Sequence, residues 1–355
     1  MKLFISKLHY KTELSFSEQV AKKALSFLSL FYGSIVCVRN FLYDKKIIKS
    51  YKSNAYTISV GNVTTGGVGK TPVTAEIANY LYCKGKKTAI LSRGYGGTLS
   101  NSEPNVISNG NEVFFDSEEA GDEPVWLANY CLNTPIITCS SRVKAAKKAE
   151  DDFNVQALIL DDGFQHRKMD RDLNLLLVDN KNRFGNEALL PAGPLREPLA
   201  GIERADKIIL VNKNYDDESA IQYCLELEKT FNKKVYLCKM IPDFVYNIVT
   251  NEHLEKNAEI AAFCAIGQPQ EFYEFLKKEY RLAVTVDFED HHYYDEANII
   301  ELIEIAKREG ISKIVTTEKD AVKIREILLK IKPNIDFYAL KLKAFLDVEE
   351  ICSGI

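Results

Sequence analysis

Short apolar runs alternate with amphipathic stretches along most of this chain of 355 residues. Residues 57–61 have the short, β-branched pattern of a strand, and residues 72–84 follow with the spacing of a helix. The same alternation continues, with strands predicted over 88–92, 134–139, 155–160, 173–178 and 207–211 and helices over 124–132 and 142–151. Buried apolar strands that alternate with helices predict an α/β fold with a mostly parallel sheet flanked by helices.

The alternation weakens over residues 213–232 and then begins again. We expect residues 234–240 and 244–249 to be two strands that pair as a connecting hairpin. A second set follows, with strands over 260–264, 283–286, 313–316 and 335–339 and helices over 270–278 and 295–309. The pattern therefore predicts a second, smaller α/β lobe joined by a β-hairpin linker, with a cleft for a ligand between the lobes.

The most apolar run, residues 24–38, lies within a basic N-terminal region. Residues 1–50 hold nine Lys or Arg side chains and three acidic ones, although the whole chain has a net charge of −4. The run is shorter than the roughly 20 residues that a helix needs to cross a bilayer. It also follows Glu13 and Glu18 and lacks a small-residue cleavage site, which argues against a secretory signal. The pattern fits a helix in the headgroup layer of an anionic membrane, or else a buried core helix.

The composition is that of a globular protein, with 46% hydrophobic and 27% charged residues. The length is sufficient for two α/β domains that each bury a core. Eight cysteines are scattered along the chain without a CxxC pair, and several lie inside apolar runs. This use of cysteine favours a reducing compartment such as the cytosol.

A glycine-rich loop, GNVTTGGVGKT, lies between the first predicted strand and the first predicted helix. Such a loop wraps backbone N–H groups around a polyphosphate, places a lysine on the β and γ oxygens, and offers a hydroxyl to Mg²⁺. Thr64 stands where the GxxxxGK[ST] pattern has a glycine, but three other glycines still allow close backbone approach. The predicted nucleotide-binding residues are Thr64, Thr65, Gly66, Gly67, Val68, Gly69, Lys70 and Thr71.

Asp161 and Asp162 directly follow the apolar run 157–160. Ligands gather at the carboxyl ends of parallel strands, and a hard cation prefers carboxylate oxygen. Either aspartate can therefore hold Mg²⁺, directly or through water. Taken alone, two aspartates after a strand are as readily a turn or a helix cap; beside a phosphate loop they are the expected metal partner.

Six motifs extend this picture over most of the chain: GNVTTGGVGKTP at 61–72, LSRGYGG at 91–97, GDEP at 121–124, DDGFQH at 161–166, LLPAGPLREP at 189–198 and DHHYY at 290–294. In these motifs and their order the chain resembles the tetraacyldisaccharide 4′-kinases, the lipid A 4′-kinases of bacteria with an outer membrane. Thr64 in place of glycine is part of that family's loop, so the departure noted above supports the resemblance.

The resemblance implies an enzyme that uses ATP and Mg²⁺ to phosphorylate the 4′-hydroxyl of an acylated glucosamine disaccharide 1-phosphate. It implies action at the cytoplasmic face of the bacterial inner membrane, with two α/β lobes joined by a two-stranded linker. We expect neither a nucleic acid nor an obligate protein partner. The expected parts are a membrane-surface helical segment, a P-loop kinase core, a hairpin linker and a C-terminal lobe, over residues 1–45, 46–233, 234–250 and 251–355.

By matching position, the resemblance implies that Asp122 is the general base toward the sugar hydroxyl, with Glu123 beside it. His291 is the implied companion that orients Asp122, although His292 is an alternative. A carboxylate suits this role because a sugar hydroxyl must lose its proton as the bond to phosphorus forms. Taken alone, Asp122 could simply begin the helix at Pro124, and both histidines could be ordinary loop residues.

The resemblance also implies that Thr71, Asp162 and Gln165 contribute to the Mg²⁺ shell, with Asp161 supporting them. Arg93 and Arg196 are candidates for binding phosphate groups, because a guanidinium binds phosphate bidentately. Either arginine could instead pair with a surface acid. Residues 316–320 follow a predicted strand and are best interpreted as a helix cap.

Two other functions are compatible with parts of the sequence. A phosphate loop also occurs in nucleotide-dependent switches and ATPases that act on protein partners rather than on a small acceptor. The basic, apolar N-terminal region could alternatively belong to a non-catalytic module that binds lipid surfaces.

Overall fold

The computed structural model describes residues 8–10, 15–213, 216–267, 269–289 and 292–355. Within these residues one continuous sheet holds twelve strands: β1 (Tyr56–Gly61), β2 (Thr88–Ser92), β3 (Asn105–Ser108), β4 (Ile136–Thr138), β5 (Ala157–Asp161), β6 (Leu173–Asp179), β7 (Lys207–Asn212), β8 (Lys234–Asn247), β9 (Glu259–Cys264), β10 (Arg281–Asp287), β11 (Lys313–Thr317) and β12 (Asp336–Phe345). Their order is β10-β9-β11-β12-β8-β7-β6-β1-β5-β2-β4-β3. Neighbours are parallel except β12 with β8 and β3 with β4, which confirms the predicted mostly parallel α/β fold.

Helices that flank the strands of the N-terminal lobe include α3 (Lys70–Cys83), α5 (Asp122–Tyr130), α6 (Arg142–Phe153) and α7 (Asp217–Phe231). Ile159 of β5 packs in the core with α3 and α5. Its neighbours Leu158 and Leu160 point to the opposite face and pack with α6. Because strand side chains alternate between faces, an all-apolar strand such as β5 requires helices on both.

The C-terminal lobe repeats this arrangement with α8 (Pro269–Glu279), α9 (Glu296–Arg308) and α10 (Glu318–Ile331). Phe263 of β9 packs in the core with α9 and α10, whereas Ile260 packs with α8 on the other face. Thr317 caps the N-terminus of α10, and its hydroxyl accepts the N–H of Asp320 at 3.2 Å. The helix cap predicted at residues 316–320 is therefore confirmed.

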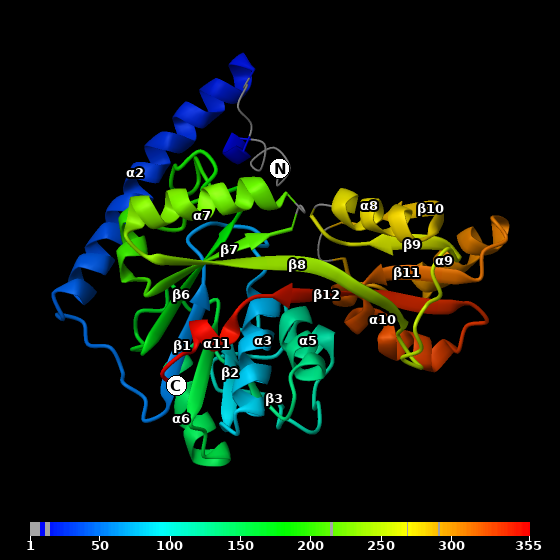
Figure 1. The fold of residues 1–355 in the computed structure, drawn as a ribbon, viewed down its shortest axis with the longest axis horizontal. Helices are drawn as coiled ribbons and strands as arrows, with labels where there is room; N and C mark the ends of the chain where they lie inside the picture. The colour runs from blue at the N-terminus through cyan, green and yellow to red at the C-terminus, as the bar shows by residue number, and fades with distance from the viewer. Residues whose placement is uncertain (1–7, 11–14, 214–215, 268, 290–291) are drawn as a thin grey trace.

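The two lobes are joined by two long strands, but these strands do not form a hairpin. Residues 234–240 and 244–249 were predicted as two strands, whereas β8 runs unbroken over residues 234–247. Its first half pairs with β7 in the N-terminal lobe, and its second half pairs antiparallel with β12 (Figure 1). The hairpin prediction is wrong because a distant strand supplies the hydrogen bonds that a local return strand was expected to supply.

The end of the chain returns to the N-terminal lobe. α11 (Val348–Ile351) packs against α3, and the Lys84 ammonium lies 3.0 Å from a carboxylate oxygen of Glu349. The predicted C-terminal lobe of 251–355 does not foresee this return, and the residue boundaries of the four parts remain predictions. The sequence pattern over residues 213–232 also did not predict α7, whose N-terminus is capped by Asp216.

The N-terminal helix α2 (Phe16–Asp44) is longer than the apolar run that predicted it. It begins with a capping box, in which the Ser15 and Glu18 side chains each bond the other's backbone N–H. By length and composition alone it could cross a membrane, with a mean hydropathy of 1.5 over its most apolar 18 residues. The segment was predicted to be too short to span a bilayer because only residues 24–38 were counted. The whole helix has 29 residues, which is long enough.

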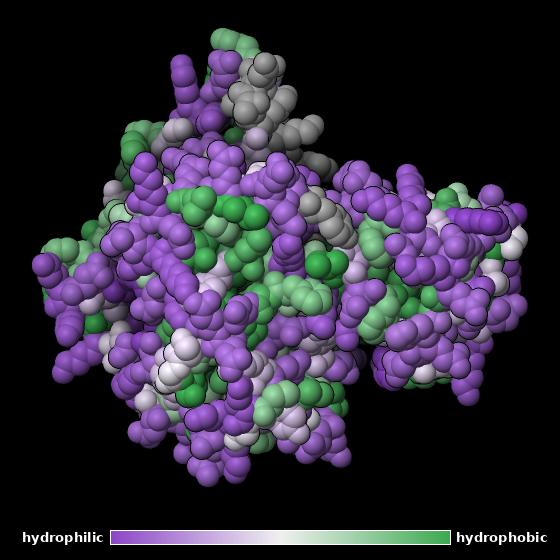
Figure 2. Space-filling view, in the orientation of Figure 1, coloured by the Kyte–Doolittle hydropathy of each residue, from purple (hydrophilic) through white to green (hydrophobic). Residues whose placement is uncertain are grey.

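α2 lies along the outside of the N-terminal lobe, so the alternative of a buried core helix is wrong (Figure 1). Apolar side chains recur along this edge of the molecule in Figure 2. The exposed ones on α2 are Phe16, Val20, Phe27, Leu28, Leu30, Phe31, Ile35, Val38 and Phe41. A helix that leaves this many large apolar side chains in solvent requires another apolar environment to cover them.

One narrow face of α2 is docked on the segment 188–197. The Ser29 hydroxyl lies 2.9 Å from the Leu189 carbonyl oxygen and accepts the Ala192 N–H at 3.1 Å. A Cβ at Gly33 would lie 2.7 Å from a Leu189 methyl carbon, so the glycine allows this close approach. Tyr32 donates to the Arg196 carbonyl at 2.6 Å. These contacts connect the helix to the loop that borders the site described below.

We expect Ser29→Ala to lower the free energy of unfolding by about 1–3 kcal/mol, because it leaves the buried Ala192 N–H without its partner, whereas the Leu189 carbonyl keeps the Gly193 N–H. The control is Ser34→Ala, whose exposed hydroxyl donates to Leu30 of the same helix. It should change stability by less than about 0.5 kcal/mol. Urea unfolding followed by circular dichroism measures both, and equal values would show that α2 is not held at Ser29.

Candidate active site

The phosphate loop joins the end of β1 to the start of α3, as predicted. Gly69 caps α3 with a φ of 104°, and Gly66 has a φ of 112°, backbone conformations that favour glycine. A Cβ added at Gly66 or Gly67 would meet no atom within 4 Å, so this part of the loop borders open space. The N-terminus of a 14-residue helix carries partial positive charge. The loop therefore has the geometry of a polyphosphate site.

Lys70 is held by two partners at the base of this loop. Its ammonium lies 3.3 Å from the Asn62 side-chain oxygen and 3.5 Å from an Asp162 carboxylate oxygen. Asn62 is fully buried and donates to the Thr64 carbonyl at 2.8 Å and to the Thr64 hydroxyl at 3.1 Å. Thr64 is not among the residues with positive φ, so a side chain is tolerated where other phosphate loops have glycine.

The segment 189–198 lies beside the loop and supports it. The Thr65 N–H donates to the Pro194 carbonyl at 2.8 Å, and the Arg196 N–H donates to the Val63 carbonyl at 2.7 Å. The Arg196 guanidinium nitrogen lies 2.9 Å from both carboxylate oxygens of Asp162. Arg196 thus pairs with an acid, as one alternative expected, but that acid belongs to the site.

Asp161 and Asp162 have opposite electrostatic environments although they are adjacent. Burial, Glu123 and Asp162 raise the pKa of Asp161 to about 7, even though its carboxylate accepts a hydrogen bond from Thr74 at 3.1 Å. Burial also opposes ionisation of Asp162, but Lys70 and Arg196 outweigh it and lower the pKa of Asp162. At neutral pH Asp162 is therefore fully ionised, and Asp161 is poised to lose its proton when a cation approaches.

The GDEP motif lies close to these carboxylates. Gly121 caps α5 with a φ of 93°, and Asp122 and Glu123 form its first turn, so Asp122 does begin a helix. α5 packs against α3, whose first turn holds Lys70, and the Glu123 charge is one cause of the raised pKa of Asp161, so the motif lies near the phosphate site. A Cβ at Gly97 would lie 2.4 Å from the Glu119 carbonyl oxygen, so the 93–97 and 119–123 segments pack directly together.

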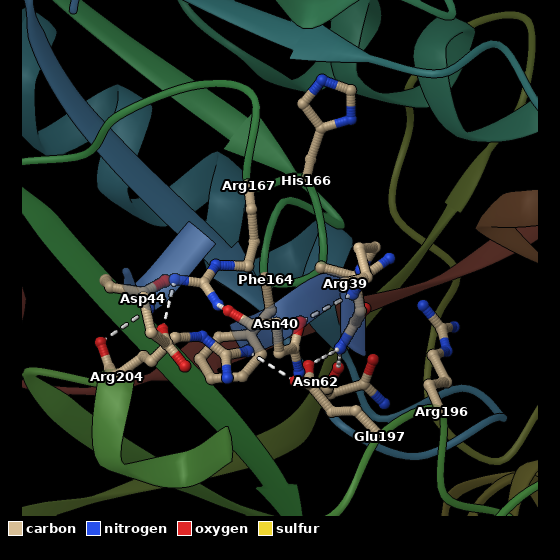
Figure 3. A network of polar contacts seen from close by, with 12 residues as sticks. Arg39, Asn40, Asp44, Asn62, Phe164, His166, Arg167, Arg196, Glu197 and Arg204 are labelled. Carbon is tan, nitrogen blue, oxygen red and sulfur yellow. Dashed lines mark hydrogen bonds and ion pairs between the residues drawn. The ribbon is translucent and has the colours of Figure 1, made fainter. Parts of the chain in front are cut away.

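Gln165 bonds Glu197, which belongs to a polar network that reaches Asn40 of α2 (Figure 3). Its amide nitrogen donates to the Asn62 carbonyl and to a Glu197 carboxylate oxygen, each at 2.8 Å. Because the nitrogen is engaged, the amide oxygen is the atom of this side chain that could bind a cation. Glu197 is fully buried. Its carboxylate accepts hydrogen bonds from the Arg204 guanidinium at 2.6 Å and from the Asn40 amide of α2 at 3.2 Å.

The two histidines and Arg93 of the predicted site do not gather with the residues described above. His291 lies outside the described residues. His292 bonds the Asn298 side chain at 3.1 Å and packs on Phe288, so it faces its own lobe. Arg93 is exposed just beyond β2, and its charge contributes to the lowered pKa of His166, which burial lowers most.

The described residues suit Mg²⁺ by chemistry rather than by a ready-made cage. Thr71 is buried in the first turn of α3, and its hydroxyl and the Asp161, Asp162 and Gln165 oxygens are all hard donors. Among the described residues no three His, Cys, Asp or Glu side chains gather as a metal site. Mg²⁺ commonly binds through one or two carboxylates and the phosphates of its nucleotide, which agrees with this donor set.

Sequence reasoning missed four residues that shape the site. Asn62 and Glu197 lie inside motifs that were recognised, but no role had been given to them. Lys213 donates to the Gly67 carbonyl, and Lys323 lies 3.1 Å from an Asp122 carboxylate oxygen. No local signal marks either lysine, because each reaches the site from a segment distant in the chain.

Three comparisons with known proteins agree on the family. The family model described as tetraacyldisaccharide-1-P 4'-kinase matches residues 21–353. A tetraacyldisaccharide 4'-kinase of Halothermothrix orenii is 33% identical over 359 residues, covering 95% of this chain and 93% of that protein. One of Chlorobaculum parvum is 37% identical over 317 residues, covering 86% of each.

A solved structure gives the same answer for the fold. The crystal structure of "apo" form LpxK from Aquifex aeolicus in complex with ATP is 31% identical, with a TM-score of 0.74. The structural alignment covers 93% of this chain and 96% of the Aquifex aeolicus chain. Sequence motifs, fold and relatives therefore converge, and this chain belongs to the tetraacyldisaccharide 4'-kinase family.

Proposed function

We propose that this chain transfers the γ-phosphate of ATP to the 4′-hydroxyl of a tetraacyldisaccharide 1-phosphate, in lipid A biosynthesis. The observation that carries the proposal is the convergence of a phosphate loop, two strand-end aspartates and the GDEP acids at one place, in a member of this kinase family. The similar Aquifex aeolicus protein was solved in complex with ATP, which supports ATP as the donor. The switch and lipid-module alternatives lack support from any relative reported above.

Lys70 and the loop backbone bind and orient the phosphates of ATP in this proposal. Positive groups placed around the negatively charged phosphoryl oxygens supply the larger part of catalysis in phosphoryl transfer. Thr71, Asp162 and the Gln165 oxygen would hold Mg²⁺, with Asp161 behind them. The ion supplies further neutralisation of phosphate charge when bound.

Asp122 accepts the proton of the sugar hydroxyl, and Glu123 shapes the field around the neighbouring carboxylates. His291 remains the proposed companion of Asp122. Arg93, exposed beyond β2, is proposed to bind a phosphate of ATP or the 1-phosphate of the acceptor. Arg196 acts by holding Asp162 in place beside Lys70.

The lipid acceptor also gives a reason for α2. We propose that its exposed apolar side chains enter the headgroup layer at the cytoplasmic face of the bacterial inner membrane. The basic N-terminal region adds attraction to anionic lipid. An enzyme whose substrate stays in a bilayer needs such a surface, because its active site must reach the headgroup.

We expect Asp122→Asn to lower kcat by about 10²- to 10⁴-fold with little change in the KM for ATP, because it removes the proton acceptor alone. Lys70→Ala should lose transfer through impaired handling of the phosphates. The control is Glu118→Gln, an exposed acid four residues before Asp122. Transfer of label from γ-labelled ATP to the tetraacyldisaccharide 1-phosphate is the measurement. Transfer by Asp122→Asn at the wild-type rate would mean that the base is misassigned.

Asp161 provides a pH-dependent test of the paired carboxylates. Its folded-state pKa of about 7 lies above the value of about 3.9 expected in the unfolded chain. Between these values the folded protein holds a proton that the unfolded chain has released, so this group makes stability fall as pH rises from about 4 to about 7. Asp161→Asn should therefore gain stability relative to wild type across that window.

Urea unfolding without Mg²⁺, at several pH values from about 4 to about 8, measures the effect of Asp161→Asn. Asp151→Asn, at an exposed carboxylate on α6, is the control for the loss of an aspartate charge. A pH-independent difference for Asp161→Asn would contradict the raised pKa.

Membrane association depends on the apolar face of α2 in this proposal. The double variant Phe31→Ser/Ile35→Ser removes two exposed apolar side chains one turn apart and should weaken binding to phosphatidylglycerol vesicles at least about tenfold. Ile221→Ser/Leu225→Ser, a similarly exposed pair on α7, is the matched control and should bind as wild type does. Vesicle sedimentation measures the binding of both variants. An equal loss of binding in the two would contradict a specific role for α2.

A further inference from the structure

We propose that Lys323, on α10 of the C-terminal lobe, is a positioning residue that orients the Asp122 carboxylate across the boundary between the lobes. The proposal rests on the proposed role of Asp122 as the proton acceptor. It adds a residue to the site that lies outside every motif considered above. It also links α10 of the C-terminal lobe to the proposed proton acceptor.

The Lys323 ammonium is buried, and four of its contacts lie within the described residues. It lies 3.1 Å from an oxygen of Asp122 and 3.6 Å from an oxygen of Asp320. It donates to the His292 carbonyl at 3.2 Å and lies 5.9 Å from the centre of the Tyr294 ring. Only 8% of the side chain is exposed. A cation this deeply buried is stable only when its partners are in place.

The two carboxylates that pair with Lys323 belong to different lobes. Asp320 is fully buried, and its carboxylate accepts the Ala265 N–H at 3.0 Å and the Thr317 hydroxyl at 2.8 Å. Lys323 is therefore anchored to the C-terminal lobe. Asp122 lies at the start of α5 in the N-terminal lobe and is partly exposed. The Lys323 ammonium, held by the C-terminal lobe, therefore positions the Asp122 carboxylate of the N-terminal lobe.

The segment bonded to Lys323 also contacts the N-terminal lobe. The Tyr293 hydroxyl lies 3.2 Å from the Gly96 carbonyl oxygen and 3.5 Å from that of Glu118. Gly96 belongs to the 93–97 segment, and Glu118 directly precedes the 119–123 segment that packs against it beside Asp122. α5 lies on the side of its lobe that faces the C-terminal lobe in Figure 1. Lys323 and Tyr293 therefore hold the acid and its surrounding loops from the same direction.

This arrangement matters because a general base acts only when its carboxylate is aligned with the reacting hydroxyl. An ion pair with a fixed ammonium restricts the rotation of an aspartate side chain at a helix start. Lys323 binds one carboxylate oxygen and so restricts the plane in which the group can accept a proton. Loss of the ammonium should slow the chemical step without disturbing the phosphate loop.

The test compares Lys323→Met with Lys323→Arg and with Lys330→Met, at full length. Lys330 lies on the same helix and pairs with Glu296 of its own lobe. Lys323→Met should lower kcat by on the order of 100-fold, as expected for misplacement of a reacting group. Its KM for ATP should stay at the wild-type value. Lys323→Arg should recover most of the loss, because the charge is kept, and Lys330→Met should behave as wild type.

A wild-type kcat in Lys323→Met would overturn the proposal. So would equal losses in Lys323→Met and Lys323→Arg when both unfold at the wild-type temperature, because the charge would then not be the cause. Amide hydrogen exchange covers the case of a poorly folded variant. Faster exchange confined to residues 119–124 and 292–298 is expected for Lys323→Met, and unchanged exchange there would also overturn the proposal.

A double-mutant cycle separates this proposal from the one on which it rests. In the Asp122→Asn background, Lys323→Met should cause little further loss, because it acts through Asp122. A full additional loss in that background would sink the positioning role alone, with Asp122 still the base. A fully active Asp122→Asn variant would instead sink the assignment of the base and the positioning role together.

Discussion

The ion pairs of Asp162 join three segments on which the site depends. Lys70 comes from the start of α3, Asp162 from the end of β5, and Arg196 from the 189–198 segment. A partly buried carboxylate is costly without cations, so each segment stabilises the placement of the other two. The same 189–198 segment holds α2 through Ser29. The proposed membrane-facing helix and the phosphate loop therefore share one structural support.

The continuity of the sheet sets a second constraint, on how the lobes meet. β8 pairs with strands of both lobes, and β12 carries the chain back to the first lobe after the second is complete. Helices α5 and α10 consequently face each other across the boundary. The acids of α5 meet lysines of α10 there, at Asp122 with Lys323 and at Glu123 with Lys319. The proposed proton acceptor thus lies where the two lobes touch rather than within either one.

The sequence predicted the elements whose signals are local. The apolar run 157–160 and the glycine-rich turn before residues 72–84 each specify a structure without reference to distant residues. β8 was misread because its second half pairs with β12, about ninety residues away, and a strand pattern does not reveal its partner. α7 was missed although its buried side chains, Ala220, Tyr223 and Leu227, have the spacing of one helix face.

The sequence by itself determined the chemical types present: a phosphate loop, aspartates at a strand end, an acidic helix start and a basic, apolar N-terminal region. It also determined the family, because six motifs in a shared order are specific. Only the tertiary structure decided the pairings, such as Asn62 with Lys70 and Lys323 with Asp122. Those pairings depend on the order of strands and the packing of lobes, which bring distant segments within hydrogen-bond distance. A local pattern carries no information about that distance.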